Sequence, residues 1–315
     1  MRVLITGAGG FVGSHIADYF ANICKKKDVV ATYHKKGFKN IANLEGKITI
    51  KKLDINNKKL VNDVIKALKP DYIYHMAAQS YVMPSWQDPE GTIKTNILGT
   101  LNILDSVKSL GLAPTIVLAC SSAEYGINYS EEIPIKETKE FRPSSPYAVS
   151  KIGQDMIGYL YWLIFGMKII RLRYFNIVGP RKVGNLCADF AKGIAEIEKG
   201  KKKGIGIGSL SSIIDLIDIK DAVSATVLAA EKGNPGDVYN VCTGNHYKVK
   251  DVFDMFIKHA KVGAKVFEDP KKKRPKEDPI FVGDNSKLRK LGWSPKIPIE
   301  QSVFETLEYW RNEVK

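Results

Sequence analysis

Val-Leu-Ile-Thr-Gly-Ala-Gly-Gly-Phe-Val-Gly, residues 3–13, is the stretch of sequence that decides the fold. Val3–Thr6 is a short apolar run typical of a strand, and apolar residues recur at helical spacing from Ile16 to Ile23. The glycines between them permit a tight turn where the backbone can approach a pyrophosphate, and the following helix offers unpaired N–H groups to that anion. A glycine-rich turn alone is weak evidence, but this one has the required strand and helix around it. We therefore predict a dinucleotide-binding turn lined by Gly7, Gly10, Phe11, Val12 and Gly13.

Strand and helix patterns alternate through the first half of the chain. Strands are predicted at residues 3–6, 29–33, 48–53, 72–77, 115–119 and 169–174, and helices at 60–68, 92–107 and 147–165. Because single helices separate the strands, we predict an α/β fold with a Rossmann-like, doubly wound parallel sheet. We expect residues 1–175 to form mainly the dinucleotide-binding domain. Residues 176–315 should form a smaller C-terminal substrate-binding region, with some segments returning to the first domain.

The composition is that of an ordinary globular protein, with 44% apolar and 26% charged residues. No apolar run reaches the roughly 18 residues that a membrane span needs, and the first residues form a strand rather than a signal peptide. We therefore expect a cytoplasmic protein without a membrane partner. The four cysteines are too scattered for a zinc site or a disulfide framework, so no metal is expected.

The net charge of +14 raises the question of nucleic-acid binding. Only 8 of the 48 basic residues are arginine, and the lysines are spread along the whole chain. Such lysines are more typical of a solvated surface than of a binding stripe. We expect no nucleic-acid partner, whereas the charge suits an anionic cofactor and substrate through long-range steering.

The end of the second predicted strand indicates the choice of nicotinamide cofactor. An acid there would hold the adenine ribose of NAD, and basic groups would accept the additional phosphate of NADP. The chain has His34, Lys35 and Lys36 and no acid, which favours NADP(H) slightly over NAD(H). The alternative is that both lysines are ordinary surface residues. Asp54 and Ile55 follow the third strand, where the adenine edge would be read.

Tyr147 and Lys151 are candidate catalytic residues. Four residues apart at the start of a predicted helix, they lie on one helical face. A phenol has a pKa of about 10, and a neighbouring ammonium can lower that pKa toward useful acid–base chemistry. This spacing is common by chance. It gains weight from Ser121 and Ser122, which end the fifth strand and could hold a substrate hydroxyl or carbonyl beside a nicotinamide.

With these motifs the chain resembles the extended short-chain dehydrogenase/reductase family. It is most similar to the branch that holds GDP-mannose 4,6-dehydratases and GDP-4-keto-6-deoxymannose reductases. The similarity runs nearly from end to end. The strings that carry it are residues 6–13, 75–82, 85–89, 96–102, 121–126, 142–151, 174–176, 238–242, 274–275, 283–287 and 291–293.

The resemblance implies a role for each matching residue. Ser121 and Tyr147 would belong to the family's catalytic set, with Tyr147 as acid or base. Lys151 would hold the nicotinamide ribose and lower the pKa of Tyr147. Ala77, Ala78 and Gln79 would line the cofactor. Six residues would lie at the substrate: Ser80, Ser85, Ser122, Asn176, Arg274 and Glu277. Of these, Asn176 would contact the phosphates of the substrate, and Arg274 and Glu277 would hold its diphosphate and ribose.

Two positions depart from the branch pattern. The dehydratases carry a glutamate where this chain has Ala123, and Glu124 is displaced by one residue. On a strand-like backbone, the Glu124 side chain would point the opposite way. Ile214 occupies the position of an arginine that binds substrate phosphate in the family. This second departure predicts weaker phosphate binding or an unusual substrate.

The predicted function is hydride transfer between a nicotinamide and C4 of a nucleotide-diphosphate sugar, and the resemblance favours a GDP-linked sugar. A 4-keto reductase or 4-dehydrogenase is favoured, then a GDP-mannose 4,6-dehydratase, then a nucleotide-sugar 4-epimerase. A catalytically inactive, cofactor-binding regulatory protein is the alternative from another class, and the intact Ser121, Tyr147 and Lys151 argue against it. The family's four-helix contact predicts a homodimer through residues 92–107 and 147–165, of which the second segment is apolar nearly all round.

Overall fold

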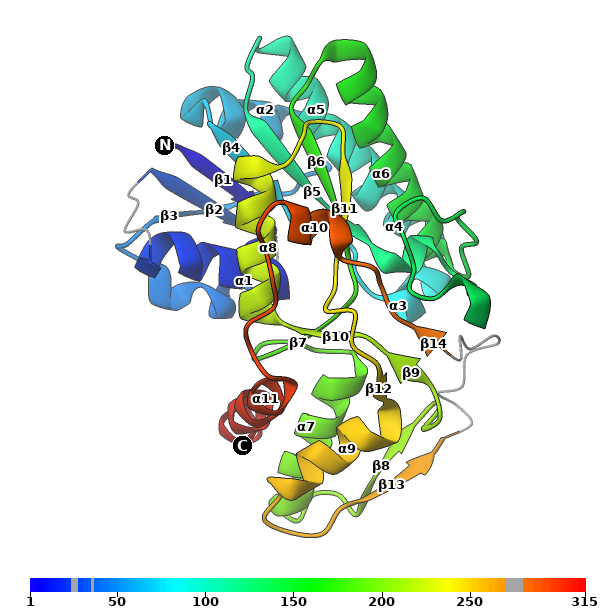
Figure 1. Ribbon diagram of the computed structural model, residues 1–315. Coiled ribbons are helices and arrows are strands. Elements are labelled where there is room, and N and C mark those ends of the chain that lie inside the picture. The colour runs from blue at the N-terminus through cyan, green and yellow to red at the C-terminus, as the bar shows by residue number, and fades with distance from the viewer. Residues whose placement is uncertain (24–27, 35–36, 270–279) are drawn as a thin grey trace.

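The computed structural model describes residues 1–23, 28–34, 37–269 and 280–315. Figure 1 shows a large sheet with helices on both of its faces, and a smaller group of helices and short strands beyond one edge of that sheet. The large sheet has seven parallel strands in the order β11-β6-β5-β4-β1-β2-β3. Their bounds are β1 Val3–Thr6, β2 Val29–Tyr33, β3 Thr49–Lys52, β4 Tyr72–His75, β5 Thr115–Ser121, β6 Ile169–Tyr174 and β11 Val238–Val241.

The doubly wound parallel sheet predicted from the sequence is confirmed. Its central strands are buried on both faces, with Val3, Leu4 and Ile5 fully inaccessible, and this explains their unbroken apolar runs. β4 ends two residues before the predicted end. There the chain turns under the glycine-rich turn, and the Met76 N–H donates to the Thr6 carbonyl at 3.2 Å. The strand order reverses between β1 and β4, and ligands of such sheets bind at the carboxyl ends of the strands beside that reversal.

Helices cover the two faces of the sheet. On one face lie α2 Lys58–Leu68, α5 Gly99–Ser109 and α6 Pro146–Phe165; on the other lie α1 Phe11–Asp18 and α8 Ile219–Lys232. The predicted helix at 92–107 is one continuous run of α4 Pro89–Ile93, a π-helical turn at Lys94–Leu98, and α5. A π-helical turn at Tyr19–Ile23 likewise extends α1, and α3 Val82–Gln87 precedes α4. Short 3-10 helices lie at Phe38–Asn40, Ala42–Leu44, Ser122–Glu124 and Ser130–Glu132.

A second core lies beyond the carboxyl edge of the sheet. It joins α7 Leu186–Glu198, α9 Val249–Lys258 and α11 Ile299–Glu313 around Phe190, Phe256 and Trp310. Its strands pair locally: β7 Asn176–Val178 with β10 Leu216–Asp218, β8 Gly204–Ile207 with β13 Lys265–Glu268, and β9 Ile213–Ile214 with both β12 Tyr247–Lys248 and β14 Ile280–Phe281. After β10 the chain returns to the large sheet as α8 and β11, and α10 Ser286–Lys290 packs beside β11.

No helix within the described ranges is both long and apolar enough to cross a membrane. Cys120, Cys187 and Cys242 are buried free thiols. Cys24 lies outside the described residues.

Candidate active site

The glycine-rich turn makes two very close backbone approaches. Gly7 has φ +67°, and a Cβ there would lie 2.6 Å from the backbone of Ala77. A Cβ on Gly13 would lie 2.4 Å from the Gly7 carbonyl oxygen. Gly10 precedes α1 and supplies no side-chain cap, so the first N–H groups of this helix are open to an anion. Phe11 and Val12 open the helix. These residues fit the pyrophosphate of a dinucleotide.

Beyond the carboxyl end of β2, where the sequence predicts the adenine ribose, His34 and Asp54 face each other. The His34 Nε2 lies 3.5 Å from an Asp54 carboxylate oxygen, and both side chains are nearly half exposed. The Ile55 side chain instead points into the core and is buried. It packs so closely against Gly99 of α5 that a Cβ on that glycine would lie 2.5 Å from it. Only the backbone of Ile55 could therefore line a ligand. Lys35 lies outside the described residues.

The segment after β4 is fastened to the helices beside it. Asn96 accepts the Gln79 N–H at 2.8 Å and donates to the Gln79 carbonyl at 2.9 Å. This clamp fixes Ala77, Ala78 and Gln79 beside the glycine-rich turn. Ser80 is exposed beyond them.

Ser85, predicted at the substrate, is fully buried. Its Oγ donates to the Val82 carbonyl at 2.6 Å and accepts the Tyr147 N–H at 3.1 Å. The hydroxyl is thus engaged within the protein, and what it orients is the first turn of α6. The sequence pattern could not show this, because the partner backbone lies 62 residues away.

Ser121, Tyr147 and Lys151 converge at the carboxyl end of β5. The Tyr147 hydroxyl shares a hydrogen bond with the Ser121 side chain. Lys151 is buried, and its Nζ donates to the Ala119 carbonyl at 2.7 Å and to Gln154 Oε1 at 2.8 Å. The Lys151 Nζ also lies 6.0 Å from the centre of the Tyr147 ring. This is the arrangement of a proton-transfer group beside a strand end.

The pKa of Tyr147 moves in the direction opposite to the expected one. Burial raises the pKa of Tyr147 to about 12, although the hydrogen bond with Ser121 acts to lower it. Burial also lowers the pKa of Lys151 to about 8. The net shift is upward because desolvation of the phenolate dominates. The Lys151 ammonium is turned toward Ala119 and Gln154, and its expected lowering effect on the pKa of Tyr147 stays a prediction.

Glu124 lies under this site and not in it. The residues after Ser121 form a 3-10 turn rather than the strand-like backbone assumed from the sequence, and Glu124 is fully buried. Its carboxylate lies 3.0 Å from the Arg173 guanidinium, on the core side of the turn. Ser122 is buried and Ala123 is partly exposed. Glu124 therefore cannot take over the role of a glutamate at position 123.

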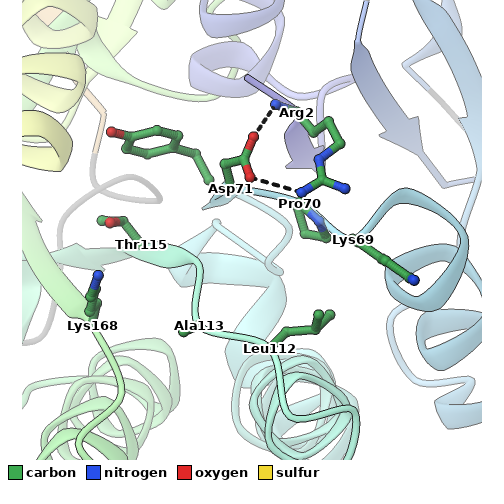
Figure 2. A pocket seen from close by; sticks show the side chains of 9 residues that line it. Arg2, Lys69, Pro70, Asp71, Leu112, Ala113, Thr115 and Lys168 are labelled. Carbon is green, nitrogen blue, oxygen red and sulfur yellow. Dashed lines mark hydrogen bonds and ion pairs between the residues drawn. The ribbon is translucent and has the colours of Figure 1, made fainter.

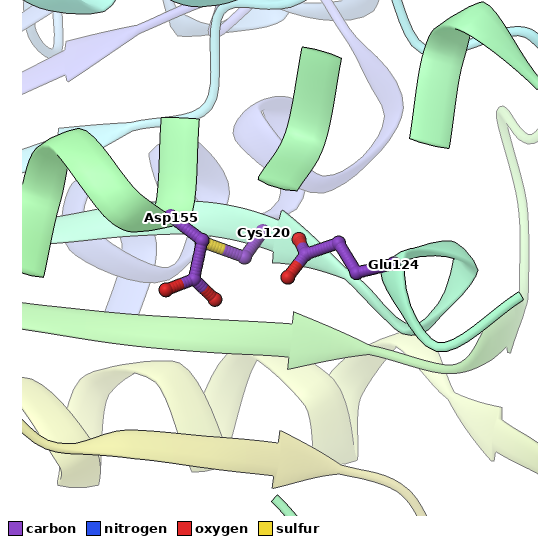
Figure 3. A group of neighbouring side chains, drawn as sticks. All are labelled: Cys120, Glu124 and Asp155. Atoms are coloured by element: carbon purple, nitrogen blue, oxygen red, sulfur yellow. The ribbon is translucent and has the colours of Figure 1, made fainter. Parts of the chain in front are cut away.

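Cys120, Glu124 and Asp155 bring ligand-type atoms within 4.8 Å of one another (Figure 3). Metal binding is electrostatically unfavourable there, because Asp155 already pairs with Arg171 and Arg173 and Glu124 contacts Arg173. The cavity in Figure 2 is unrelated to this site. It has a volume of about 340 Å³ and lies at the amino ends of the strands, where Arg2 pairs with Asp71 beside Lys69 and Lys168.

Three of the positions that the sequence interpretation assigns to the substrate side are Asn176, Arg274 and Glu277, and Ile214 stands where the family has an arginine. Asn176 is exposed at the start of β7, and its Nδ2 donates to the Asp215 carbonyl at 3.3 Å. Ile214 is half buried in β9 and carries no charge. Arg274 and Glu277 lie outside the described residues.

Lys182 is a candidate that the sequence interpretation missed. Its Nζ lies 5.0 Å from the centre of the Phe11 ring, which belongs to the glycine-rich turn. No described carboxylate pairs with this ammonium, and burial lowers the pKa of Lys182 to about 8. In the sequence, Lys182 is one of 40 lysines, and only the fold brings it to the turn.

This combination of sheet, glycine-rich turn and Ser–Tyr–Lys set defines an NAD(P)-dependent enzyme of the extended short-chain dehydrogenase/reductase type. The chain belongs to the family described as GDP-mannose 4,6 dehydratase, whose profile matches residues 4–306. It is 29% identical to the GDP-6-deoxy-D-mannose reductase of Pseudomonas aeruginosa, over 100% of this chain and 98% of that protein. It is 27% identical to a Vibrio cholerae GDP-mannose 4,6-dehydratase, over 96% of this chain and 92% of that protein.

Solved structures agree with this assignment. The structure of RMD from Pseudomonas aeruginosa complexed with NADPH has a TM-score of 0.86 and 27% identity, over 100% of both chains. The Thermus thermophilus UDP-glucose 4-epimerase complex with NAD has a TM-score of 0.88 and 28% identity, again over 100% of both chains. Both of these similar structures contain a nicotinamide dinucleotide, and the turn around Gly7 and Gly13 is the candidate place for one in this chain.

We predict that Lys182→Met weakens NADPH binding, because Lys182 lies beside the glycine-rich turn and forms no ion pair with a carboxylate among the described residues. A bound phosphate favours the charged ammonium, so the wild-type Kd should rise as the pH increases through about 8, where free Lys182 loses its proton. Lys151, with a pKa that is also about 8, titrates in both proteins. The difference between the two pH profiles therefore isolates Lys182.

Fluorescence titration of NADPH from pH 6.5 to 9.5 measures both profiles; these pH limits are chosen to span roughly 1.5 units on either side of the expected transition. Lys258→Met, at an exposed lysine of α9, is the matched control and should bind like the wild type. Equal affinity and equal pH dependence in Lys182→Met and wild type would remove Lys182 from the site.

Proposed function

We propose that the protein reduces the C4 keto group of a nucleotide-diphosphate sugar, with GDP-4-keto-6-deoxymannose as the substrate. The observation that carries the proposal is the turn after β5. Loss of water from C5 and C6 would need a proton carrier at position 123, and the methyl group of Ala123 carries none. Glu124 is enclosed by Arg173 and Asp155. Reduction at C4 needs no group at this position.

Each residue of the catalytic set has a defined part in this reaction. When bound, the reduced nicotinamide supplies a hydride to C4. Tyr147 donates a proton to the oxygen on C4, and Ser121 holds that oxygen by a hydrogen bond. With its pKa raised to about 12, Tyr147 is protonated at neutral pH, which is the form that a reduction requires. Lys151 holds the cofactor ribose.

Three alternatives fit less well. A dehydratase is disfavoured by Ala123. A 4-epimerase would use the same Ser121, Tyr147 and Lys151 set, and the raised pKa of Tyr147 does not distinguish it from a reductase. An inactive regulatory protein would not need the convergence of Ser121, Tyr147 and Lys151 on one strand end. The identity with a GDP-6-deoxy-D-mannose reductase over the whole chain supports the reductase and a GDP-linked sugar.

The reaction is tested in two incubations. With GDP-mannose and NADP⁺ we expect no 4-keto-6-deoxy product, and with GDP-4-keto-6-deoxymannose and NADPH we expect oxidation of NADPH. Tyr147→Phe should slow the second reaction by about 100-fold, since it removes the general acid. Tyr309→Phe in α11 is the control and should leave the rate unchanged. A dehydrated product in the first incubation would contradict the proposal.

For the cofactor, we propose that NADPH binds at least as tightly as NADH. His34, Lys35 and Lys36 follow β2 without an acid among them, and the similar RMD structure contains NADPH. Asp54, which follows β3, comes close to this strand end, and its carboxylate lies 3.5 Å from the His34 Nε2. Dissociation constants measured by fluorescence decide between the cofactors. A strong preference for NADH would contradict the prediction.

We further propose a cytoplasmic homodimer with a four-helix contact. Apolar side chains on α6 are left open to solvent, with Leu163 55% and Ile164 60% exposed, and Leu98 beside α5 is 49% exposed. A second copy of these helices would remove this surface from water. Sedimentation equilibrium at micromolar concentration should give twice the mass of the chain. A monomer would contradict the prediction.

A further inference from the structure

A buried network of charged groups lies directly under the catalytic residues. Glu124 Oε1 accepts the Ser121 backbone N–H at 2.8 Å, and Ser121 Oγ accepts the Ala123 N–H at 3.2 Å. The Glu124 side chain therefore holds the backbone at the start of the turn, and the Ser121 side chain holds the backbone within it. Ser121 is also the hydrogen-bonding partner of the Tyr147 hydroxyl. By holding the Ser121 backbone, the Glu124 carboxyl therefore helps to position the Ser121 side chain relative to that hydroxyl.

The second oxygen of Glu124 has no donor of its own. Arg173 Nε donates to Asp155 Oδ2 at 2.8 Å and lies 3.0 Å from Glu124 Oε2. A guanidinium Nε carries one hydrogen, and it cannot satisfy two carboxylate oxygens fully. Glu124 Oε2 is accordingly a buried oxygen without a hydrogen-bond partner, whereas Asp155 also pairs with Arg171.

A proton on Glu124 resolves this shortage of donors. Glu124 and Asp155 are both fully buried, and two neighbouring carboxylates resist simultaneous ionisation. A protonated Oε2 can donate to Asp155, which keeps its negative charge between the two arginines. The electrostatics agree: burial and the Asp155 charge raise the pKa of Glu124 well above its ordinary value, while Arg173 and Arg171 keep the pKa of Asp155 low.

We propose that Glu124 is a positioning residue that stays protonated at neutral pH and links the Ser121 turn to α6 through a hydrogen bond to Asp155. Asp155 lies one turn after Lys151 and two turns after Tyr147 on the same helix. The link therefore sets the distance between Ser121 and the two catalytic residues of α6. Its effect on turnover depends on the reductase activity proposed above, but the proton itself does not.

The proton also matters for the charge that Tyr147 experiences. The ionisable groups around Glu124 come from three elements: Cys120 of β5, Tyr147, Lys151 and Asp155 of α6, and Arg171 and Arg173 of β6. Burial is the main reason that the pKa of Tyr147 is raised, and a negative charge on Glu124 acts in the same direction, which makes the phenol a poorer acid. A neutral Glu124 avoids this while keeping the turn closed.

Two variants and a control separate the roles of proton and charge. In Glu124→Gln the amide can still accept from Ser121 and donate to Asp155, so kcat/KM should stay within about threefold, and its alkaline limb should not move. Glu124→Ala loses both contacts, and a misplaced Ser121 should cost about tenfold or more in kcat. Glu131→Gln, at an exposed glutamate of the same loop region, should behave like the wild type.

Infrared spectroscopy of the wild type minus Glu124→Gln reads the proton directly, whether or not the keto sugar is the substrate. We expect the carbonyl stretch of a protonated carboxylic acid at neutral pH. A carboxylate band in its place would overturn the proposal even if the reductase activity is present. A shift of the alkaline limb to lower pH in Glu124→Gln would also overturn it, because it would show that a charge had been removed.

Discussion

The ion pair between Arg173 and Asp155 is the interaction on which the arrangement of the site depends. Arg173 projects from β6, Asp155 belongs to α6, and both are almost fully buried. The Arg173 guanidinium also donates to the Tyr125 hydroxyl and the Glu137 carbonyl, each at 3.0 Å. A buried pair of this kind is costly to break, because loss of one partner leaves the other charged and unpaired in the core. Arg173 thus fastens α6, the turn after β5 and the loop at Glu137 to β6.

A second constraint acts at the opposite side of the site. The backbone of Gly7 approaches that of Ala77 so closely that a Cβ on Gly7 cannot be accommodated. This contact brings the first and fourth strands together where the strand order reverses, with the open end of α1 above it. The cofactor cradle and the Ser121–Tyr147–Lys151 set therefore lie along one edge of one sheet. That proximity is what hydride and proton transfer to the same carbonyl requires.

The sequence was sufficient for the features that depend on local order. The apolar runs of the strands, the glycine-rich turn and the four-residue spacing of Tyr147 and Lys151 are all readable within a few residues. It was insufficient where distant segments meet. Ser85 bonds a backbone group of α6, Ile55 packs under Gly99, and Lys182 reaches Phe11 from the region after β7. The raised pKa of Tyr147 could not be predicted from the sequence either, because it results from burial, which depends on the fold and not on the spacing of Tyr147 and Lys151.

In the proposed reaction, the reduced nicotinamide supplies a hydride to C4 of the sugar and Tyr147 completes the reduction with a proton. The most direct test of this reaction uses NADPH deuterated at C4 of the nicotinamide, on the face from which transfer occurs, with GDP-4-keto-6-deoxymannose as acceptor. Nuclear magnetic resonance of the product should show one deuterium at C4 of the sugar and none at C5 or C6. A product without deuterium at C4, or a sugar recovered unreduced while the deuterated cofactor stays intact, would contradict the account.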